Sequence, residues 1–441
     1  MDNKEKLTFG YTPEEYKKFT VNAWRYLLMF SFLYCCFYCM RLNLANVSGY
    51  MVEEGKFTKD QIGILTSTLF WTYGFGHLFN GRISEIFGPS KFVTMAVIFS
   101  FAANMLMGLT ESLVLMAIIW GFNGYFQSMA WTPGLATITK WWPGSKRGFA
   151  AGFAHAFSGF GQALVTLAVA GSYELSEALG WGLGYKAAFF LPPIIPLVML
   201  IIFRVFAKPT PAHVGLKDYV EDDPEKERAE AEMQALLKTK GKLYPYKHVL
   251  SNPKFFIWVF IAFATGIARY GLATWVPIYF FENFGVEVTE GLLGSLALPV
   301  GMAVGTLTVP TLTDKFCPTN RLPAVIISSI AGAAMIFIFL LLDPTVNWQM
   351  LLILAILFMA GFAIYAINGL AFASATDVGG RVFSGTTSGI LDFSLYMGAA
   401  CQSLVYGFVS SKIGWTWVFI TIAFFCAIIA GLAAIGSKRS K

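Results

Sequence analysis

The first apolar stretch of the chain reads NAWRYLLMFSFLYCCFYCMRLNLANVSGY, residues 22–50. A helix needs about 20 residues to cross a bilayer, and this stretch is longer, with Arg41 deep inside it. A second arginine, Arg269, lies inside another apolar stretch in the second half of the chain. A guanidinium stays protonated in proteins and costs roughly 2.5–3.5 kcal/mol near the bilayer centre. Two such residues predict an anion that both of them hold.

The composition of the whole chain indicates an integral membrane protein. Of its 441 residues 56% are hydrophobic and only 13% are charged, and the mean hydropathy is +0.60. This leaves too little polar surface for a water-soluble globule. Short alternating strands typical of a barrel are missing, which favours helices. Twelve stretches are long enough to span, at about 22–50, 60–81, 91–110, 113–139, 148–172, 183–207, 255–281, 290–312, 322–342, 348–374, 384–409 and 415–436.

The spans fall into two halves that repeat each other. A charged run, residues 208–253, separates them and reads as a polar linker with one amphipathic helix. Residues of the two halves correspond in order: Arg41 with Arg269, Glu85 with Asp314, Lys91 with Arg321, Arg147 with Arg381 and His155 with Asp392. Parallel repeats of this kind predict two pseudo-symmetric six-helix bundles with a substrate site between them near the midplane. We expect bundles over 22–207 and 254–437, flanked by segments 1–21 and 438–441.

The basic residues predict the orientation. Of the 32 Lys and Arg, only Lys56, Lys59, Lys186 and Lys412 fall in loops assigned to the outside. The positive-inside rule therefore places both termini in the cytoplasm of a multi-pass protein of the cell (inner) membrane. The polar first 21 residues do not resemble a cleavable signal peptide. Thr12, Pro13 and Glu15 instead predict the capped start of a short helix that leads into Trp24.

Several other functions are not indicated. The six cysteines lack the spacing of metal or disulfide sites, and no serine, cysteine or metal constellation suggests catalysis. We therefore expect no enzyme, no cofactor and no metal. The net charge of +6 fits the anionic inner leaflet and does not indicate a nucleic acid partner. Nothing marks an oligomer, and we expect a monomer.

A loop motif predicts a latch between the halves. GRISEIFGPSK, residues 81–91, carries Arg82, Glu85 and Lys91, and the second half repeats it loosely as PTLTDKFCPTNR, residues 310–321, with Asp314 and Arg321. These charges could pair when the inward gate is closed and separate when it opens. Alternatively, they only obey the positive-inside rule.

These and other motifs carry a family resemblance. The runs are YCMRLNLA (38–45), YGFGHLFNGRISE (73–85), GYFQSMAWTPGLATITKWWPGSKRG (124–148), PTPAHVGL (209–216) and RYGLATWVPIYF (269–280). Over about residues 22–436 the chain resembles the major facilitator superfamily, and within it the organophosphate:phosphate antiporter branch, which includes glycerol-3-phosphate and hexose-phosphate carriers. The resemblance implies that Arg41, Arg269 and His155 bind substrate. It also implies a cavity lined by Tyr38, Gln127, Trp131, Tyr365 and Tyr396.

The chain departs from the glycerol-3-phosphate carriers at charged positions. Leu42 and His77 stand where they have lysines, Thr274 where they have an aspartate, and Asp392 adds a carboxylate in the eleventh span. Asp392 could pair with an arginine, carry a proton or hold the cationic group of a zwitterion. His155 and His77 could also couple charge, although a buried histidine is often only hydrogen-bonded in the core.

The resulting expectation is a secondary transporter that works by alternating access. It would exchange an organophosphate or phosphonate-like anion for inorganic phosphate. One alternative is proton-coupled symport of a carboxylate, sulfonate or zwitterion, with Asp392 or His155 as the relay. Another alternative is a transporter-like sensor of a sugar phosphate.

Overall fold

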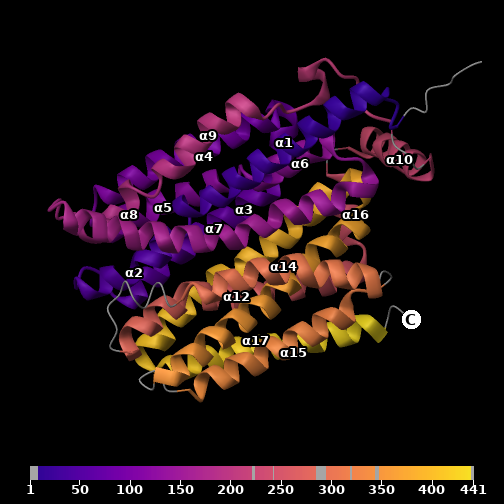
Figure 1. Ribbon diagram of the computed structural model, residues 1–441. Helices are drawn as coiled ribbons and strands as arrows, with labels where there is room; N and C mark the ends of the chain where they lie inside the picture. Colours follow the sequence, from indigo (N-terminus) through magenta and orange to yellow (C-terminus); the bar gives the residue numbers. More distant parts are fainter. Residues whose placement is uncertain are drawn as a thin grey trace, which may run out of the picture.

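A computed structural model of the chain describes residues 8–220, 224–241, 243–284, 295–317, 320–342 and 347–438. Within these ranges the fold is helical, apart from an isolated bridge between Thr8 and Tyr11. Figure 1 shows two helical bodies lying side by side, one from each half of the chain. The prediction of an all-α protein built from two helix bundles is confirmed.

The first body and the linker follow the chain order. The first body contains α1 (Pro13–Phe37), η1 (Tyr38–Met40), α2 (Asn43–Glu53), α3 (Lys59–Phe87), α4 (Pro89–Gly108), α5 (Leu113–Gln127), α6 (Trp131–Trp141), α7 (Gly144–Ala178), η2 (Gly184–Lys186), α8 (Ala187–Phe190) and α9 (Ile194–Phe206). The linker contains η3 (Pro211–Val214), α10 (Pro224–Lys240) and α11 (Tyr244–Leu250).

The second body contains α12 (Pro253–Phe284), α14 (Ala297–Phe316), α15 (Leu322–Leu340), α16 (Asn347–Lys412) and α17 (Trp415–Lys438). The start of α1, the linker helix α10 and the end of α17 lie at one end of the molecule, and α2 and α8 lie at the other (Figure 1). We call these the termini end and the far end.

The predicted capped helix at the N-terminus is present, but it is not short. The Thr12 side chain accepts from the Glu15 backbone, the Glu15 side chain accepts from the Thr12 backbone, and Pro13 is the first helical residue. From this cap α1 continues without interruption into the first span. The capping box therefore starts a spanning helix.

The first predicted span, residues 22–50, is not one continuous helix. α1 ends at Phe37, a 3₁₀ turn follows, and α2 begins only at Asn43, so the helix is interrupted at Arg41. An interruption frees backbone carbonyls that must find other partners in a membrane. The Met40 carbonyl accepts from the side chains of Asn104 on α4 at 3.1 Å and Asn123 on α5 at 2.8 Å. The fourth predicted span, 113–139, is likewise divided into α5 and α6.

The tenth and eleventh predicted spans form one helical element, α16. A straight helix would separate Tyr365 from Tyr396 by about 46 Å at 1.5 Å per residue. The two tyrosines instead bond to neighbouring residues of α12, Arg269 and Tyr270. The element must therefore reverse direction between them, as two spans require. It is nevertheless helical throughout Asn347–Lys412.

The least apolar spans lie where the two bodies meet. Nine helical stretches of the described residues are long and apolar enough to cross a membrane, and a tenth, Ala297–Thr313, is shorter. With α3 and the second half of α16 they cover the twelve predicted spans. α3 packs against α16, and the Ser67 hydroxyl donates to the Ala400 carbonyl at 2.9 Å. These two spans carry polar residues because part of their surface faces the other body.

A second contact between the bodies joins α7 to α14. At Gly159 an added Cβ would lie 2.6 Å from Ala303 of α14, closer than side-chain atoms approach. The two bodies can therefore approach this closely only with glycine at residue 159.

Candidate functional site: two buried arginines between the bodies

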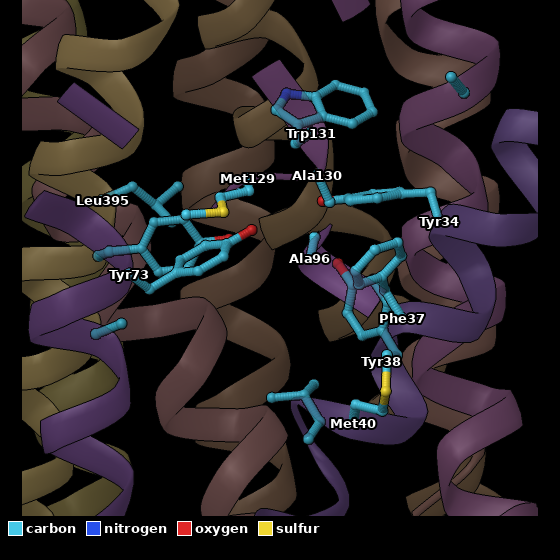
Figure 2. Close-up of a cluster of buried hydrophobic side chains, with 14 of the residues drawn as sticks. Tyr34, Phe37, Tyr38, Met40, Tyr73, Ala96, Met129, Ala130, Trp131 and Leu395 are labelled. Atoms are coloured by element: carbon cyan, nitrogen blue, oxygen red, sulfur yellow. The ribbon is translucent and has the colours of Figure 1, made fainter. Parts of the chain in front are cut away.

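Arg41 is buried where the first span is interrupted, with 2% of its surface exposed. Its Nη1 donates to the Tyr73 hydroxyl of α3 at 2.5 Å. Its guanidinium carbon lies 4.1 Å from the centre of the Tyr38 ring and 5.8 Å from that of Tyr34. Aromatic faces attract cations, so these rings compensate in part for the lost hydration. In Figure 2, Tyr34 and Tyr38 lie on one side of the cluster and Tyr73 on the other.

Arg269 has a matching environment in the second body. It lies on α12 with 2% of its surface exposed. Its Nη2 donates to the Tyr365 hydroxyl of α16. Its guanidinium carbon lies 4.0 Å from the centre of the Tyr365 ring and 4.6 Å from that of Tyr270. Each arginine is thus held by a tyrosine hydroxyl and tyrosine rings from its own body.

A chain of tyrosines connects the two arginines across the interface. The ring of Tyr73, which accepts from Arg41, lies edge-on to Tyr396 with 4.3 Å between ring centres. The hydroxyl of Tyr396 bonds to that of Tyr270 at 3.1 Å. Tyr270 in turn lies against Arg269. Three tyrosines therefore link the two arginines across the interface. Binding of one substrate by both arginines stays a prediction.

Both arginines keep unused donors. Arg41 Nε and Nη2 and Arg269 Nε are buried and have no hydrogen-bond partner in the described part of the chain. Among the salt bridges of the described residues none involves either arginine. A buried guanidinium without a carboxylate is costly. An anion with several oxygens would satisfy donors from both sides.

The α7 face contributes polar groups that bond across the interface. Ser158 Oγ lies 2.9 Å from the Tyr365 hydroxyl, and Gln162 Nε2 donates to the same hydroxyl at 3.3 Å. His155 Nε2 lies 2.9 Å from Asn368 Nδ2 on α16, while its Nδ1 has no hydrogen-bond partner among the described residues. The predicted residues His155 and Tyr365 therefore belong to one polar layer that joins α7 to α16.

Asp392 faces His77 and not His155, its counterpart in the other half. His77 Nδ1 of α3 lies 3.7 Å from Asp392 Oδ2 of α16 and 3.2 Å from the Thr132 hydroxyl of α6. Both side chains are buried, 1% and 7% exposed. His77 Nε2 and Asp392 Oδ2 have no hydrogen-bond partner within the described ranges. The ring of His77 stacks on Tyr396, so this pair adjoins the tyrosine chain.

The remaining predicted residues, Gln127 and Trp131, lie on the first body. The centre of the Trp131 ring lies 5.2 Å from that of His155 and 4.7 Å from that of Tyr34, so Trp131 packs against both side chains. Figure 2 shows it at the edge of the aromatic cluster around Tyr38. Gln127 is buried, and neither atom of its amide has a hydrogen-bond partner among the residues described. Substrate contact by either residue stays a prediction.

Most of the predicted latch lies outside the described side chains. The backbones of Arg82 and Glu85 belong to α3 and that of Asp314 to α14, but these side chains are not described. Lys91 is exposed and Arg321 is half-buried. The pairing of these residues therefore stays a prediction.

An ionic contact between the bodies is present at the far end instead. Lys59 Nζ at the start of α3 lies 2.9 Å from Glu282 Oε2 near the end of α12. Glu282 Oε2 also accepts from Trp415 Nε1 at 2.8 Å. Beside this pair, the Ser411 hydroxyl donates to Asp60 Oδ1 at 3.0 Å. This group, which we call the far-end latch, joins the first body to the second.

Sequence reasoning missed Tyr73, Tyr270, Asn368 and the far-end latch. Tyr73 could have been found, because it lies four residues before His77 and therefore on the same face of α3. Tyr270 directly follows Arg269. No signal in the sequence pairs Lys59 with Glu282, because they are 223 residues apart. Among the described residues there is no group of three or more His, Cys, Asp or Glu that could hold a metal ion.

The chain is similar in sequence to several known transport proteins. A probable hexose phosphate transport protein of Chlamydia muridarum is 27% identical over 434 residues, covering 95% of this chain and 91% of its own. The glycerol-3-phosphate transporter of Bacillus subtilis is 28% identical, with 92% and 90% covered. The hexose-6-phosphate:phosphate antiporter of Salmonella typhimurium is 28% identical over 296 residues, which cover 64% of this chain and 61% of that protein.

The fold is also similar to a solved structure. A bacterial homologue of the human lysosomal transporter Spinster, in an inward-facing and unoccupied conformation, superposes with a TM-score of 0.73 at 16% identity, covering 97% of this chain and 98% of that one. Residues 30–400 match the Major Facilitator Superfamily. The chain therefore belongs to the Major Facilitator Superfamily.

Proposed function

We propose that the chain exchanges a small organophosphate for inorganic phosphate across the cell membrane by alternating access. The observation that carries this proposal is the pair of buried guanidinium groups, one from each body, which have free donors and form no salt bridge in the described part of the chain. The similarity to the hexose phosphate and glycerol-3-phosphate transporters supports the same substrate class.

The geometry suggests how phosphate would be held. The planar fork of an arginine donates two parallel hydrogen bonds to two oxygens of one phosphate. Arg41 has two unpaired nitrogens and Arg269 has one, and their tyrosine partners could be displaced to free more. A phosphate with three terminal oxygens could therefore bind both arginines at once. Binding to both would draw the two bodies together around it.

Exchange requires that the empty carrier switch slowly. A ligand lowers the barrier to switching only if it binds the closed intermediate more tightly than the open states. Without an anion, the closed intermediate brings together two guanidinium groups whose charges repel each other. Bound phosphate or organophosphate removes this repulsion, so only a loaded carrier crosses readily. Inorganic phosphate moving out could then drive organophosphate in.

Counterflow in proteoliposomes tests the proposal. With phosphate trapped inside, uptake of radiolabelled external phosphate or sugar phosphate should be rapid, and without internal phosphate it should be nearly absent. Arg41→Lys and Arg269→Lys keep the charge but lose the fork, so each should reduce exchange by about tenfold or more, as expected for one lost hydrogen bond to a charged group. Arg204→Lys is the matched control, because Arg204 is exposed and bonds only to Ser90 in the described contacts.

Two outcomes would contradict exchange. Uptake that needs a pH gradient and no internal phosphate would indicate symport. A thermal shift with sugar phosphate in detergent, combined with no uptake in liposomes, would indicate a sensor.

A second candidate function is proton-coupled transport of a zwitterionic or carboxylate solute, and the contact between His77 and Asp392 favours it. This pair combines an acid and a base in the core, with free atoms on both. Such intramembrane groups often carry protons or hold a cation. In Asp392→Asn, unchanged pH dependence together with an unchanged ranking of substrates would exclude both roles. A shift in either one would support this candidate.

The predicted orientation supports the direction of exchange. We propose that the termini end faces the cytoplasm, because nearly all the basic residues of the chain fall in loops assigned to that side. Under this orientation the far-end latch closes the outer side. Modification of an engineered cysteine near either terminus, in intact cells compared with lysed cells, tests the assignment.

A further inference from the structure

A large apolar groove lies between the two bodies, outside the arginine site. Its volume is about 700 Å³, and its walls come from α3, α11, α12 and α16. Phe79 of α3, Leu250 of α11, Phe263 of α12 and Phe393 and Met397 of α16 are among the lining residues. The groove therefore combines one helix of the first body, two of the second and a helix of the linker.

The lining offers no free polar side chain among the described residues. It includes two hydroxyl groups, and both donate to backbone carbonyls: Tyr246 to Leu78 at 2.6 Å and Ser394 to Val259 at 2.7 Å. All the other lining side chains are hydrocarbon or thioether. A polar solute would lose its hydration here without compensation. The chemistry of the groove fits a hydrocarbon chain.

The position of the groove indicates where that chain comes from. α3, α12 and α16 are spanning helices, and Phe79 is 56% exposed on their surface. In a bilayer such a surface contacts acyl chains. The linker side of the groove, which we call its mouth, carries the exposed Leu243, directly before α11, and the exposed Leu250 at the end of α11. The exposed basic residues Lys247 and His248 lie on the same helix. Basic residues next to a bilayer attract anionic headgroups.

We propose that an acyl chain of an anionic membrane phospholipid occupies this groove, with its phosphate near the basic residues of α11. The site adjoins the polar core, because Leu78 follows His77 on α3 and Phe393 follows Asp392 on α16. A lipid seated here contacts both bodies and the linker. It stabilises the conformation in which α3 and α16 lie as they do in this structure, so lipid composition sets how often the carrier leaves that conformation.

Photolabelling of the full-length purified protein tests this inference. The probe is phosphatidylglycerol with a diazirine in one acyl chain, mixed into nanodiscs of phosphatidylcholine. Label should concentrate in peptides that contain residues 78–83 and 390–397. Leu250→Asp and Leu243→Asp place a negative charge at the mouth on exposed residues, and each should reduce this labelling about fivefold, the size expected for one charge at an anionic surface. Leu236→Asp, on the exposed surface of α10, is the matched control and should not change it.

Three results would overturn the proposal. One is label spread evenly around the membrane belt, and another is equal labelling in Leu250→Asp and Leu236→Asp. The third is equal labelling by a diazirine phosphatidylcholine with the same chains, because the anionic headgroup would then contribute nothing. The assay involves no transport, so its outcome is independent of whether the chain exchanges phosphate.

Discussion

Two tyrosine hydroxyls hold the donors that an anion would use. Tyr73 accepts from Arg41, and Tyr365 accepts from Arg269. A hydroxyl is a weaker partner for a guanidinium than a phosphate oxygen, which carries charge. Each tyrosine therefore accepts one hydrogen bond from its arginine without an anion, and a phosphate oxygen could replace it. Tyr365 also bonds to Ser158 and Gln162 of the other body. Displacement of its hydroxyl would therefore break two hydrogen bonds between the bodies.

Replacing Tyr73 by phenylalanine should make the free protein less stable but phosphate binding tighter. In Tyr73→Phe the Nη1 of Arg41 loses its partner, and an unsatisfied buried donor costs about 1–3 kcal/mol. Phosphate can take that donor, so binding recovers part of the loss. Thermal unfolding with and without phosphate should give a lower melting temperature for the free variant and a larger phosphate-induced increase.

Tyr406→Phe is the control for this prediction. Tyr406 is equally buried in the second body, and its hydroxyl has no hydrogen-bond partner in the described residues. Its removal should not lower the melting temperature of the free protein, because no described hydrogen bond is lost, and it should leave the phosphate-induced increase unchanged. If Tyr73→Phe instead weakens phosphate binding, then Tyr73 contacts the anion directly and is not displaced by it.

Among the elements, the interrupted first span is the feature that places Arg41. Arg41 directly follows the 3₁₀ turn at residues 38–40, and α2 begins two residues later at Asn43. The interruption is stable because Asn104 and Asn123 take the Met40 carbonyl, and Asn43 bonds to Asn104 Oδ1 at 2.7 Å. Three asparagines thus support an irregular backbone inside the membrane.

Removing either asparagine that bonds to Met40 should destabilise the protein. Hydrogen bonds between membrane helices contribute about 0.6 kcal/mol on average and up to about 1.7. We expect losses in this range for Asn104→Ala and Asn123→Ala, with Asn104→Ala the larger because Asn104 bonds to more groups. Denaturant unfolding in detergent micelles measures the loss. Asn22→Ala is the control, since Asn22 is half-buried and its side chain bonds within α1 to the Lys18 carbonyl. Equal losses in all three variants would refute a special role for Met40.

The far-end latch should control how easily that end opens. Lys59 and Glu282 are partly exposed, 16% and 25%, and exposed pairs contribute about 0.2–1 kcal/mol. Lys59→Met or Glu282→Gln should therefore shift the balance toward the open far end by about 1.5-fold to fivefold. Thr274 is buried on α12 between Arg269 and Glu282 of the latch. Modification of an engineered cysteine at this position should become faster by the same factor.

The charge exchange supplies the control for the latch. Lys59→Glu combined with Glu282→Lys should restore part of the original rate, because the ion pair is rebuilt while the bonds to Trp415 and to the Ser410 carbonyl are lost. Lys56→Met should leave it unchanged, because Lys56 pairs with Glu111 inside the first body. If the exchanged pair is modified as fast as the Lys59→Met variant, the ion pair is not what holds this end closed.

At the scale of the whole molecule, the two bodies close around the arginines. Both guanidinium groups are only 2% exposed, so an anion can reach them only if the bodies separate at one end. The α3–α16 and α7–α14 contacts are where this separation must occur. The far-end latch and the apolar groove lie along the first of these contacts.

Gly159→Ala should prevent the close approach of α7 and α14. Its Cβ would lie 2.6 Å from Ala303, and overpacking of this kind costs about 1–3 kcal/mol. We expect less exchange and faster hydrogen exchange in the peptides of α7 and α14. Gly171→Ala lies on the same helix with nothing within 4 Å of its added Cβ, so it should behave as the unmodified protein. Equal activity of the two variants would mean that this contact does not close during transport.

Much of the architecture could be predicted from the chain alone. The length of the apolar stretches, the polar linker and the repeated order of charged residues predicted spanning helices in two bundles, and Arg41 and Arg269 stood out as a pair. These features are local: a bilayer requires about 20 apolar residues for each crossing and penalises each buried charge wherever it occurs.

Only the tertiary structure decided which side chains meet. The interruption at Arg41, the tyrosine chain, the pairing of His77 with Asp392 and not with His155, and the contact between Lys59 and Glu282 all depend on how helices far apart in the sequence are rotated toward each other. An apolar helix can present almost any face to a neighbour without changing its hydropathy. Its partners are therefore determined by packing across the interface, which the order of residues along one helix does not record.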